Sequence, residues 1–236
     1  MGCRSYSAVS DHDIASQSRN VEYLSACKAF PSTSSTLPFL VSPEWHRSDG
    51  SGPLVAQQLV KNGHKVPLYA RNQQRAKDAG SPCPGAEAIL VGDLSDMTQM
   101  KQLVSEANKG GSFDCVLHNA GIYQGGFRKT DEGLPGLITV DVIAPYLLTC
   151  LMEKPKRLVF LSSYSHYSGD GSVNDLTWQE RGEKGRSDTR AYSDSKLYHN
   201  MLANAFARRW PDVSSSPFHP GWMVTNMGGR SATGDF

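Results

Sequence analysis

Three short apolar runs, over residues 88–94, 113–121 and 157–163, most constrain what this chain can fold into. Each run is long enough for one strand and ends in side chains that can bind a ligand. Buried strands of a parallel sheet have this near-continuous apolar character, and their carboxyl ends meet at one edge of the sheet. The residues that close the runs are Asp93-Leu94, Asn119-Ala120-Gly121 and Ser162-Ser163. The pattern predicts a ligand site at that edge.

Strand-like and helix-like segments alternate from residue 37 onward, which predicts an α/β fold with a doubly wound parallel sheet of the Rossmann type. We expect strands over 38–42, 64–70, 89–91, 114–118 and 158–162, and a sixth ending near 218. We expect helices over 54–61, 73–79, 97–107, 133–152 and 191–209. Residues 1–36 are rich in serine and lack periodicity, so we assign 1–36 to an irregular N-terminal extension and 37–236 to one domain.

Tyr192 and Lys196 stand four residues apart near the start of the last expected helix. Residues at this spacing lie on one helix face, so the ammonium can approach the phenol. A nearby cation favours the phenolate, which makes the tyrosine usable as a proton donor or acceptor closer to neutral pH. On its own, such a pair more often consists of a packed tyrosine and a solvated lysine.

The ordered set of motifs resembles the short-chain dehydrogenase/reductase family, in particular its retinol-dehydrogenase-like branch. The set runs from Asp93 through Asn119-Ala-Gly121, Ser163 and the Tyr192/Lys196 pair to the segment His219-Pro-Gly-Trp-Met-Val-Thr225. The resemblance covers roughly residues 50–229. The segment between Ser163 and Tyr192 is longer than in the simplest members, and its stretches 168–171 and 180–187 are polar and rich in glycine. We interpret it as a surface insertion near the substrate entrance.

The resemblance implies a catalytic set of Ser163, Tyr192 and Lys196. Tyr192 would be the general acid or base, Lys196 would favour its phenolate and hold the nicotinamide ribose, and Ser163 would bond the substrate oxygen. The alternative for Ser163 is a hydroxyl that only caps backbone groups, a task that Ser162 could also perform. Many members carry a catalytic Asn where this chain has Asp141. Because the carboxylate opposes the phenolate, we expect reduced rather than abolished activity.

The resemblance also implies a dinucleotide site. Asp93 would bond the adenine, Asn119 and Gly121 would line the cofactor floor, and Met223 and Thr225 would contact the carboxamide. Arg71 follows the second strand, where NAD-specific members place an acidic residue, so NADP (NADPH) is favoured. The residues assigned to cofactor binding are Gly50, Ser51, Gly52, Arg71, Asp93, Asn119, Gly121, Tyr192, Lys196, Met223 and Thr225.

Two regions depart from the family pattern. The phosphate loop keeps Gly50 and Gly52, but His46 stands where its first glycine belongs, and a side chain there crowds the approach to the pyrophosphate. After Thr225 only the stretch 226–236 remains, and it carries neither a helix nor a strand pattern. We therefore expect the last strand of the sheet to be missing, which would leave an exposed sheet edge prone to association.

Composition narrows the possible partners and the setting. The net charge is +1 with no basic block, so nothing indicates nucleic acid as a partner. The five cysteines are scattered without metal-binding spacing, so we expect no metal site and no disulfide framework. No apolar stretch approaches the roughly 18–20 residues that span a bilayer. We expect a soluble, cytoplasmic protein that binds a small molecule, and the resemblance allows a homodimer or homotetramer.

These observations favour an NADP-dependent oxidoreductase that interconverts a small or medium-sized carbonyl compound and its alcohol, and they are compatible with a role in a specialised metabolic pathway. A second hypothesis is a non-catalytic descendant that acts as a binding or regulatory protein, motivated by the altered phosphate loop. A third is a nucleotide-sugar epimerase or dehydratase, which shares the Tyr/Lys pair, but such chains carry a further substrate domain. The sequence does not identify the substrate or the preferred direction.

Overall fold

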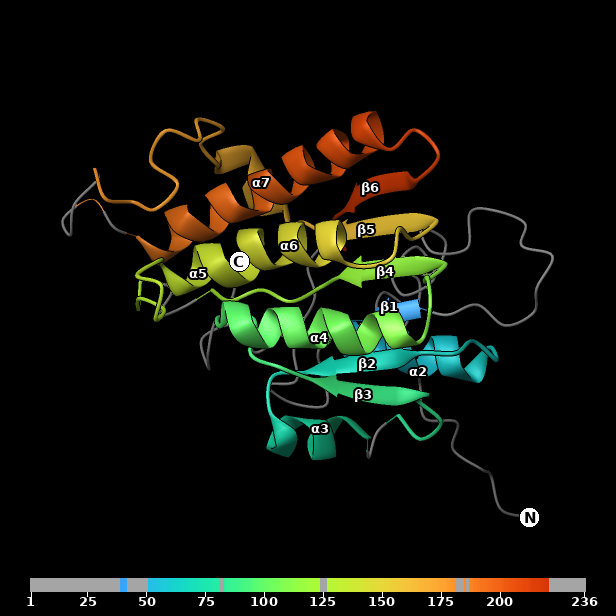
Figure 1. Ribbon diagram of the computed structural model, residues 1–236. Coiled ribbons are helices and arrows are strands. Elements are labelled where there is room, and N and C mark those ends of the chain that lie inside the picture. The colour runs from blue at the N-terminus through green and yellow to red at the C-terminus, as the bar shows by residue number, and fades with distance from the viewer. Residues whose placement is uncertain are drawn as a thin grey trace, which may run out of the picture.

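The computed structural model describes residues 39–41, 51–80, 83–123, 127–180, 185 and 187–220, the first range and parts of the first helix by their backbone only. Six strands form one parallel sheet in the order β3-β2-β1-β4-β5-β6 (Figure 1). The order reverses between β1 and β4, and in such open sheets a ligand crevice lies outside the carboxyl ends of the strands at this point. The predicted doubly wound sheet is confirmed.

The strands and helices follow the predicted alternation with small differences at their ends. The strands are β1 (Phe39–Val41), β2 (Pro67–Ala70), β3 (Ala88–Val91), β4 (Cys115–His118), β5 (Arg157–Leu161) and β6 (Ser214–Phe218). The helices are α2 (Ser51–Lys61), α3 (Gln73–Gly80), α4 (Met97–Lys109), α5 (Gly136–Ile138), η1 (Thr139–Ile143), α6 (Ala144–Leu151), η2 (Tyr164–Ser168) and α7 (Asp188–Arg209).

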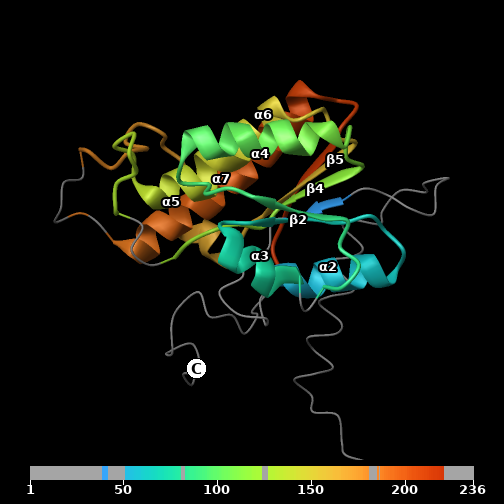
Figure 2. The same ribbon diagram turned by 60° about the horizontal axis from the view of Figure 1, so that its bottom comes forward.

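Helices cover both faces of the sheet. In Figure 2, α2 and α3 lie on one side of the strands, and α4, α6 and α7 lie on the other. Each side has its own apolar core. Leu59, Leu68 and Leu117 are buried in the core beneath α2, whereas Leu103 and Phe160 belong to the core beneath α4, α6 and α7. Apolar side chains on both sheet faces explain why the strand sequences are apolar throughout rather than alternating.

The long central helix starts later than predicted and is not a regular α-helix. We expected it over 133–152, but α5 begins at Gly136. Gly133 adopts a positive φ of 78°, which lies outside the helical range, so the helix does not include it. Between α5 and α6 the chain widens into a π-helical segment, η1, with Asp141 at its centre. Widened turns of this kind are frequent at functional sites.

The segment between η2 and α7 is less superficial than we expected. Trp178 is only 1% exposed and adopts a φ of 55°. Its ring packs edge-on against Phe127, 4.7 Å between centroids, within a cluster that includes Leu137 and Tyr198. The segment is therefore not exposed throughout, because Trp178 packs into the core between the two polar stretches.

Several expectations lie outside the described residues. These are the irregular extension over 1–36, His46 in the phosphate loop, and the missing strand after Thr225. Among the residues that the structure does describe, no helix is long and apolar enough to cross a membrane. The same residues contain no group of three or more His, Cys, Asp or Glu side chains placed to hold a metal ion.

Candidate active site

The first half of α7 carries the predicted Tyr192 and Lys196 to the carboxyl edge of the sheet. The Lys196 ammonium lies over the phenol ring of Tyr192, with Nζ 5.1 Å from the ring centroid. The lysine is buried, and the tyrosine is half-buried. The ring of Tyr123 meets that of Tyr192 edge-on at 5.0 Å, and its hydroxyl lies 3.0 Å from Thr189 Oγ1. The structure therefore brings the cation and the phenol together as predicted.

Asp141 binds the same lysine from the π-helical segment. Lys196 Nζ donates to Asp141 Oδ2 at 3.1 Å, and the two side chains are 4% and 0% exposed. The other oxygen, Oδ1, accepts the backbone N–H of Ile122 at 2.8 Å. Burial raises the pKa of the Asp141 carboxyl, and the nearby Lys196 ammonium and these hydrogen bonds oppose that shift.

Gly121 is packed directly against this ion pair. A Cβ atom added to Gly121 would lie 2.8 Å from Lys196 Nζ and 3.0 Å from Asp141 Oδ2. Both distances are at or below the closest approach that a methyl group tolerates, so a side chain here would displace the pair. The glycine that closes the predicted Asn119-Ala-Gly121 motif is thus required by the packing around Lys196.

The two serines that follow β5 differ in their contacts and in their exposure. The Ser162 hydroxyl is buried and donates to the backbone carbonyl of Lys196 at 2.9 Å, which ties β5 to α7. The Ser163 hydroxyl is half-buried and accepts the backbone N–H of Ser165 at 3.3 Å, as the cap of η2. Ser163 therefore has a capping role, and its partial exposure leaves it accessible to a ligand at the sheet edge.

His199, one turn beyond Lys196, connects three elements at the base of the site. Its Nδ1 lies 2.6 Å from the carbonyl oxygen of Leu161 in β5, and its Nε2 makes a short contact with the carbonyl oxygen of Asp141 in η1. Burial, and secondarily the Lys196 charge, lower the pKa of His199 to about 3, while the two carbonyl contacts favour the protonated ring, because a neutral ring can donate to only one of them. The histidine thereby fixes the π-helical segment against the catalytic helix.

The opposite part of the sheet edge carries the predicted adenine-side residues. Arg71 follows β2 and Asp93 follows β3, and Arg71 Nε lies 3.5 Å from Asp93 Oδ2. The arginine side chain is 64% exposed. Asp93 Oδ1 also accepts the backbone N–H of Ser95 at 2.9 Å, which forms a tight turn after the strand.

The remaining predicted cofactor residues are described to different extents. Asn119 is buried at the end of β4, beside Gly121. Gly52 is buried in the first turn of α2, and Ser51 is described there by its backbone only. Gly50, Met223 and Thr225 lie outside the described residues, so their assignment stays a prediction.

Three contacts of the site were not predicted from the sequence. They are the ion pair of Asp141 with Lys196, the bridge made by His199, and the edge contact of Tyr123. A signal for His199 was present, because it follows Lys196 by three residues and so lies on the same face of α7. The ion pair joins residues that are 55 positions apart, and no local sequence pattern indicates it.

Comparisons with known proteins point to one protein family. A family profile described as "short chain dehydrogenase" matches residues 47–156. The short-chain dehydrogenase chyC of Penicillium rubens is 46% identical over 186 residues, which cover 79% of this chain and 72% of the relative. Human retinol dehydrogenase 14 is 27% identical over 77% of this chain and 61% of its own length.

A solved structure supports the fold at lower identity. The short-chain dehydrogenase of Sphingobium yanoikuyae in complex with NADPH matches with a TM-score of 0.61 and 19% identity, over 83% of this chain and 74% of that one. Together with the extended identity to chyC, the motifs at the sheet edge confirm the predicted family. The chain belongs to the short-chain dehydrogenase family and is an oxidoreductase.

Proposed function

We propose that this protein is an NADP-dependent oxidoreductase that interconverts a carbonyl compound of small or medium size and its alcohol. The observation that carries the proposal is the position of the Lys196 ammonium over the Tyr192 ring, at the sheet edge where Ser163 follows β5. A phenol beside a cation can give or take a proton near neutral pH. We assign this chemistry to the domain over 37–236.

The residues present fit a dinucleotide along the carboxyl edge of the sheet. Gly121 and the buried Asn119 lie at one end, where Lys196 would hold the nicotinamide ribose. Arg71 and Asp93 line the other end, where they would bind the adenosine half. In between, the first turn of α2 offers backbone N–H groups to the phosphates. When bound, the cofactor supplies or accepts the hydride.

Each catalytic residue has a distinct part. Tyr192 gives its proton to the substrate oxygen during reduction and takes it back during oxidation. Lys196 places its positive charge beside the ring of Tyr192. The Ser163 hydroxyl donates to the same substrate oxygen and stabilises negative charge that develops there, an interaction that removal of comparable donors shows to be worth about 10²–10³ in rate.

The preference for NADP is supported by Arg71, which follows β2 and has an exposed guanidinium that could bind a 2′-phosphate. The test is a fluorescence titration of the purified protein with NADPH and with NADH. We expect NADPH to bind more tightly, and Arg71→Ala to remove about 10-fold or more of that advantage, since charge-assisted bonds contribute about 1.5–3 kcal/mol.

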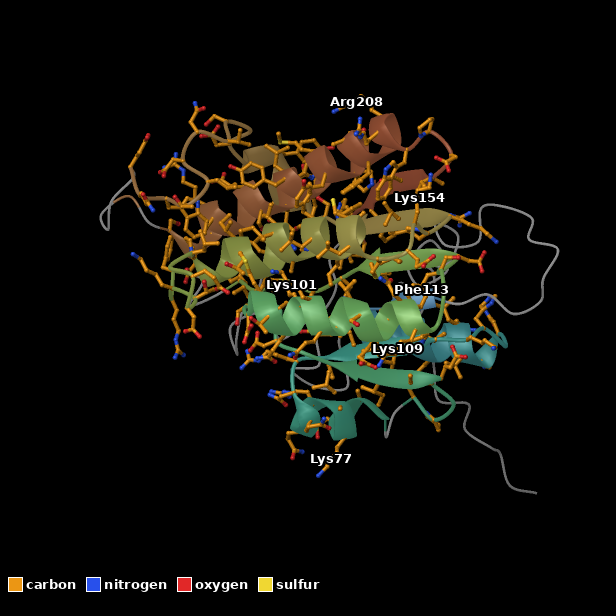
Figure 3. All side chains as sticks on the ribbon, in the orientation of Figure 1. Lys77, Lys101, Lys109, Phe113, Lys154 and Arg208 are labelled. Atoms are coloured by element: carbon orange, nitrogen blue, oxygen red, sulfur yellow. The ribbon has the colours of Figure 1, made fainter. Side chains whose placement is uncertain are left out.

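Lys109→Ala is the matched control, because Lys109 lies at the C-terminal end of α4, away from the carboxyl ends of the strands (Figure 3). It should bind both nucleotides like the unmodified protein. Equal affinities for NADPH and NADH, unchanged by Arg71→Ala, would overturn the assignment of NADP.

The same titration, combined with a turnover assay, distinguishes an enzyme from a non-catalytic descendant. We expect Tyr192→Phe to bind NADPH normally but to lose turnover of a panel of ketones and aldehydes by at least about 10²-fold, the range typical of general acid catalysis. Binding of NADPH by the unmodified protein without turnover of any panel member would favour the non-catalytic alternative.

A further inference from the structure

The short helix η2 has Ser163 at its start and Gly169 at its end, and both ends are held against α7. We propose that Gly169 and Asp194 are positioning residues that fix the Ser163 hydroxyl relative to the phenol of Tyr192. This proposal rests on the roles of Ser163 and Tyr192 in the proposed function. Its test includes a measurement that needs neither cofactor nor substrate.

η2 connects its two ends rigidly, because it is a single tight turn. The carbonyl oxygen of Ser163 accepts the backbone N–H of His166 at 3.1 Å and lies 2.6 Å from His166 Nδ1. The carbonyl oxygen of His166 in turn accepts the backbone N–H of Gly169 at 3.1 Å. Only His166 stands between the serine and the glycine in this chain of bonds, so a displacement of Gly169 reaches Ser163.

Gly169 makes a contact with α7 that a side chain would prevent. An added Cβ atom would lie 2.6 Å from the backbone carbonyl oxygen of Ser193 and 2.9 Å from Leu197 Cβ. Both distances are shorter than a Cβ atom tolerates, and the backbone of α7 cannot turn aside as a flexible side chain can. The φ of Gly169 is −77°, which any residue adopts, so the contact alone requires glycine.

Asp194 holds the next residue of the same segment. Asp194 is 0% exposed, and its Oδ1 accepts the backbone N–H of Asp170 at 2.7 Å. A buried N–H group and its acceptor are costly to separate, so this bond resists movement of the segment away from α7. Further along the helix, the Tyr198 hydroxyl donates to the carbonyl oxygen of Ser172 at 3.2 Å. The contacts of Gly169 and Asp170 with α7, here called the η2 tether, lie on the turns of the helix that carry the catalytic pair.

The other end of η2 is fixed to the same helix just before Ser163. The buried Ser162 hydroxyl donates to the carbonyl oxygen of Lys196 at 2.9 Å. Ser163 therefore lies between two points of attachment to α7. In the proposed reaction the hydroxyls of Ser163 and Tyr192 must both reach one substrate oxygen, and such convergence depends on a fixed spacing of the two groups.

The decisive comparison is Gly169→Ala against Gly171→Ala, the same change made two residues apart. We expect Gly169→Ala to lower kcat/KM for carbonyl reduction by about 10-fold or more, because small misplacements of catalytic groups have effects of this size. Its affinity for NADPH should be unchanged, because the change displaces η2 rather than α7. An added Cβ at Gly171 meets only Leu197 Cδ2 at 3.6 Å, so Gly171→Ala should match the unmodified protein in both measurements.

A double-mutant cycle shows whether the η2 tether acts through Ser163. Ser163→Ala alone should lower kcat/KM by about 10²-fold or more, as loss of a comparable donor does. In that background Gly169→Ala should have little further effect, because the hydroxyl that it displaces is already absent. Fully additive losses would overturn the proposal, since they would reveal a general disturbance rather than a displaced serine.

Asp194 provides an independent test through a conservative change. Asp194→Asn keeps an oxygen that can accept the N–H of Asp170, whereas Asp194→Ala does not. In the cofactor-free protein, we expect Asp194→Ala to raise amide hydrogen exchange across residues 163–170, and Asp194→Asn to restore the protection. kcat/KM should fall and recover in parallel. If Asp194→Ala leaves both exchange and kcat/KM unchanged, the proposal is wrong, and this holds even where Gly169→Ala does not fold.

Failure of this proposal differs from failure of the proposed function. Unmodified protein that turns over no ketone or aldehyde would contradict the proposed function, and hydrogen exchange would then decide whether the η2 tether holds η2 in place. An active unmodified protein whose Gly169→Ala and Asp194→Ala variants are equally active would leave the proposed function standing and overturn the positioning role.

Discussion

At the scale of single residues, the site depends on groups that touch the catalytic pair rather than on the pair alone. Lys196 forms an ion pair with Asp141, and its ammonium also packs against Gly121. The sequence identified Gly121 as part of a cofactor floor. The structure adds a second demand on the same atom, because a methyl group there would collide with both members of the ion pair.

Replacement of Gly121 by alanine tests this packing. We expect Gly121→Ala to displace the Lys196 ammonium and to lower kcat/KM by about 10-fold or more, as small misplacements of catalytic groups do. The measurement is steady-state kinetics together with circular dichroism, which should show a folded protein. Gly171→Ala is the control, because an added Cβ there meets only Leu197 Cδ2 at an ordinary 3.6 Å. Unchanged kinetics in Gly121→Ala would contradict the packing argument.

At the scale of elements, the segment between η2 and α7 is anchored by a large buried side chain. Trp178 and the partly buried Leu176 pack into the cluster formed by α5, η1 and α7, and backbone groups of Asp170 and Ser172 also bond to α7. Two apolar residues among polar ones show no helix or strand period, so the sequence did not indicate that this part of the segment is buried. The strands and the other helices were predictable because each repeats its apolar spacing over several residues.

Removal of this anchor should loosen the segment and destabilise the fold. We expect Trp178→Ala to lower the free energy of unfolding by about 3–5 kcal/mol, the usual range for truncating a fully buried tryptophan. Val173→Ala, in the same segment but at a residue 56% exposed, should change it by less than about 0.5 kcal/mol. Urea unfolding of both variants gives the comparison, and equal effects would show that Trp178 is no special anchor.

At the scale of the whole molecule, the parallel sheet and most helix positions follow from the sequence, whereas contacts between distant segments do not. The apolar runs predicted the strands, and their polar ends predicted the edge where Ser163 and Tyr192 lie. The pairing of Asp141 with Lys196 could not be predicted, because it depends on how η1 docks against α7. A buried charge is favourable only after that docking supplies its partner.

The stability of the molecule should decrease in mild acid. Burial lowers the pKa of His118 to about 3, well below the roughly 6.5 of an unfolded histidine. Between these values the unfolded chain binds the extra proton and the folded chain does not, so stability is lost as pH falls from about 6.5 toward 3. At about pH 5 the loss from His118 alone is roughly 2 kcal/mol relative to neutral pH.

Urea unfolding at about pH 7 and pH 5 measures this loss, with His118→Asn as the comparison. His118 Nε2 lies 2.9 Å from Thr149 Oγ1, and the Asn amide can make a similar bond without titrating in this range. The variant should therefore lose about 2 kcal/mol less than the unmodified protein between the two pH values. Identical losses would show that His118 does not contribute.

The contact between η1 and α7 also bears on how such an enzyme can be altered. Positions 141 and 196 cannot be varied one at a time in a mutant library without leaving an uncompensated buried charge, and position 121 restricts the volume available to both. The three positions therefore have to be varied together or kept unchanged. A search for new specificities should leave these three positions unchanged and randomise the exposed residues of η2 that follow Ser163, such as Tyr164 and Tyr167.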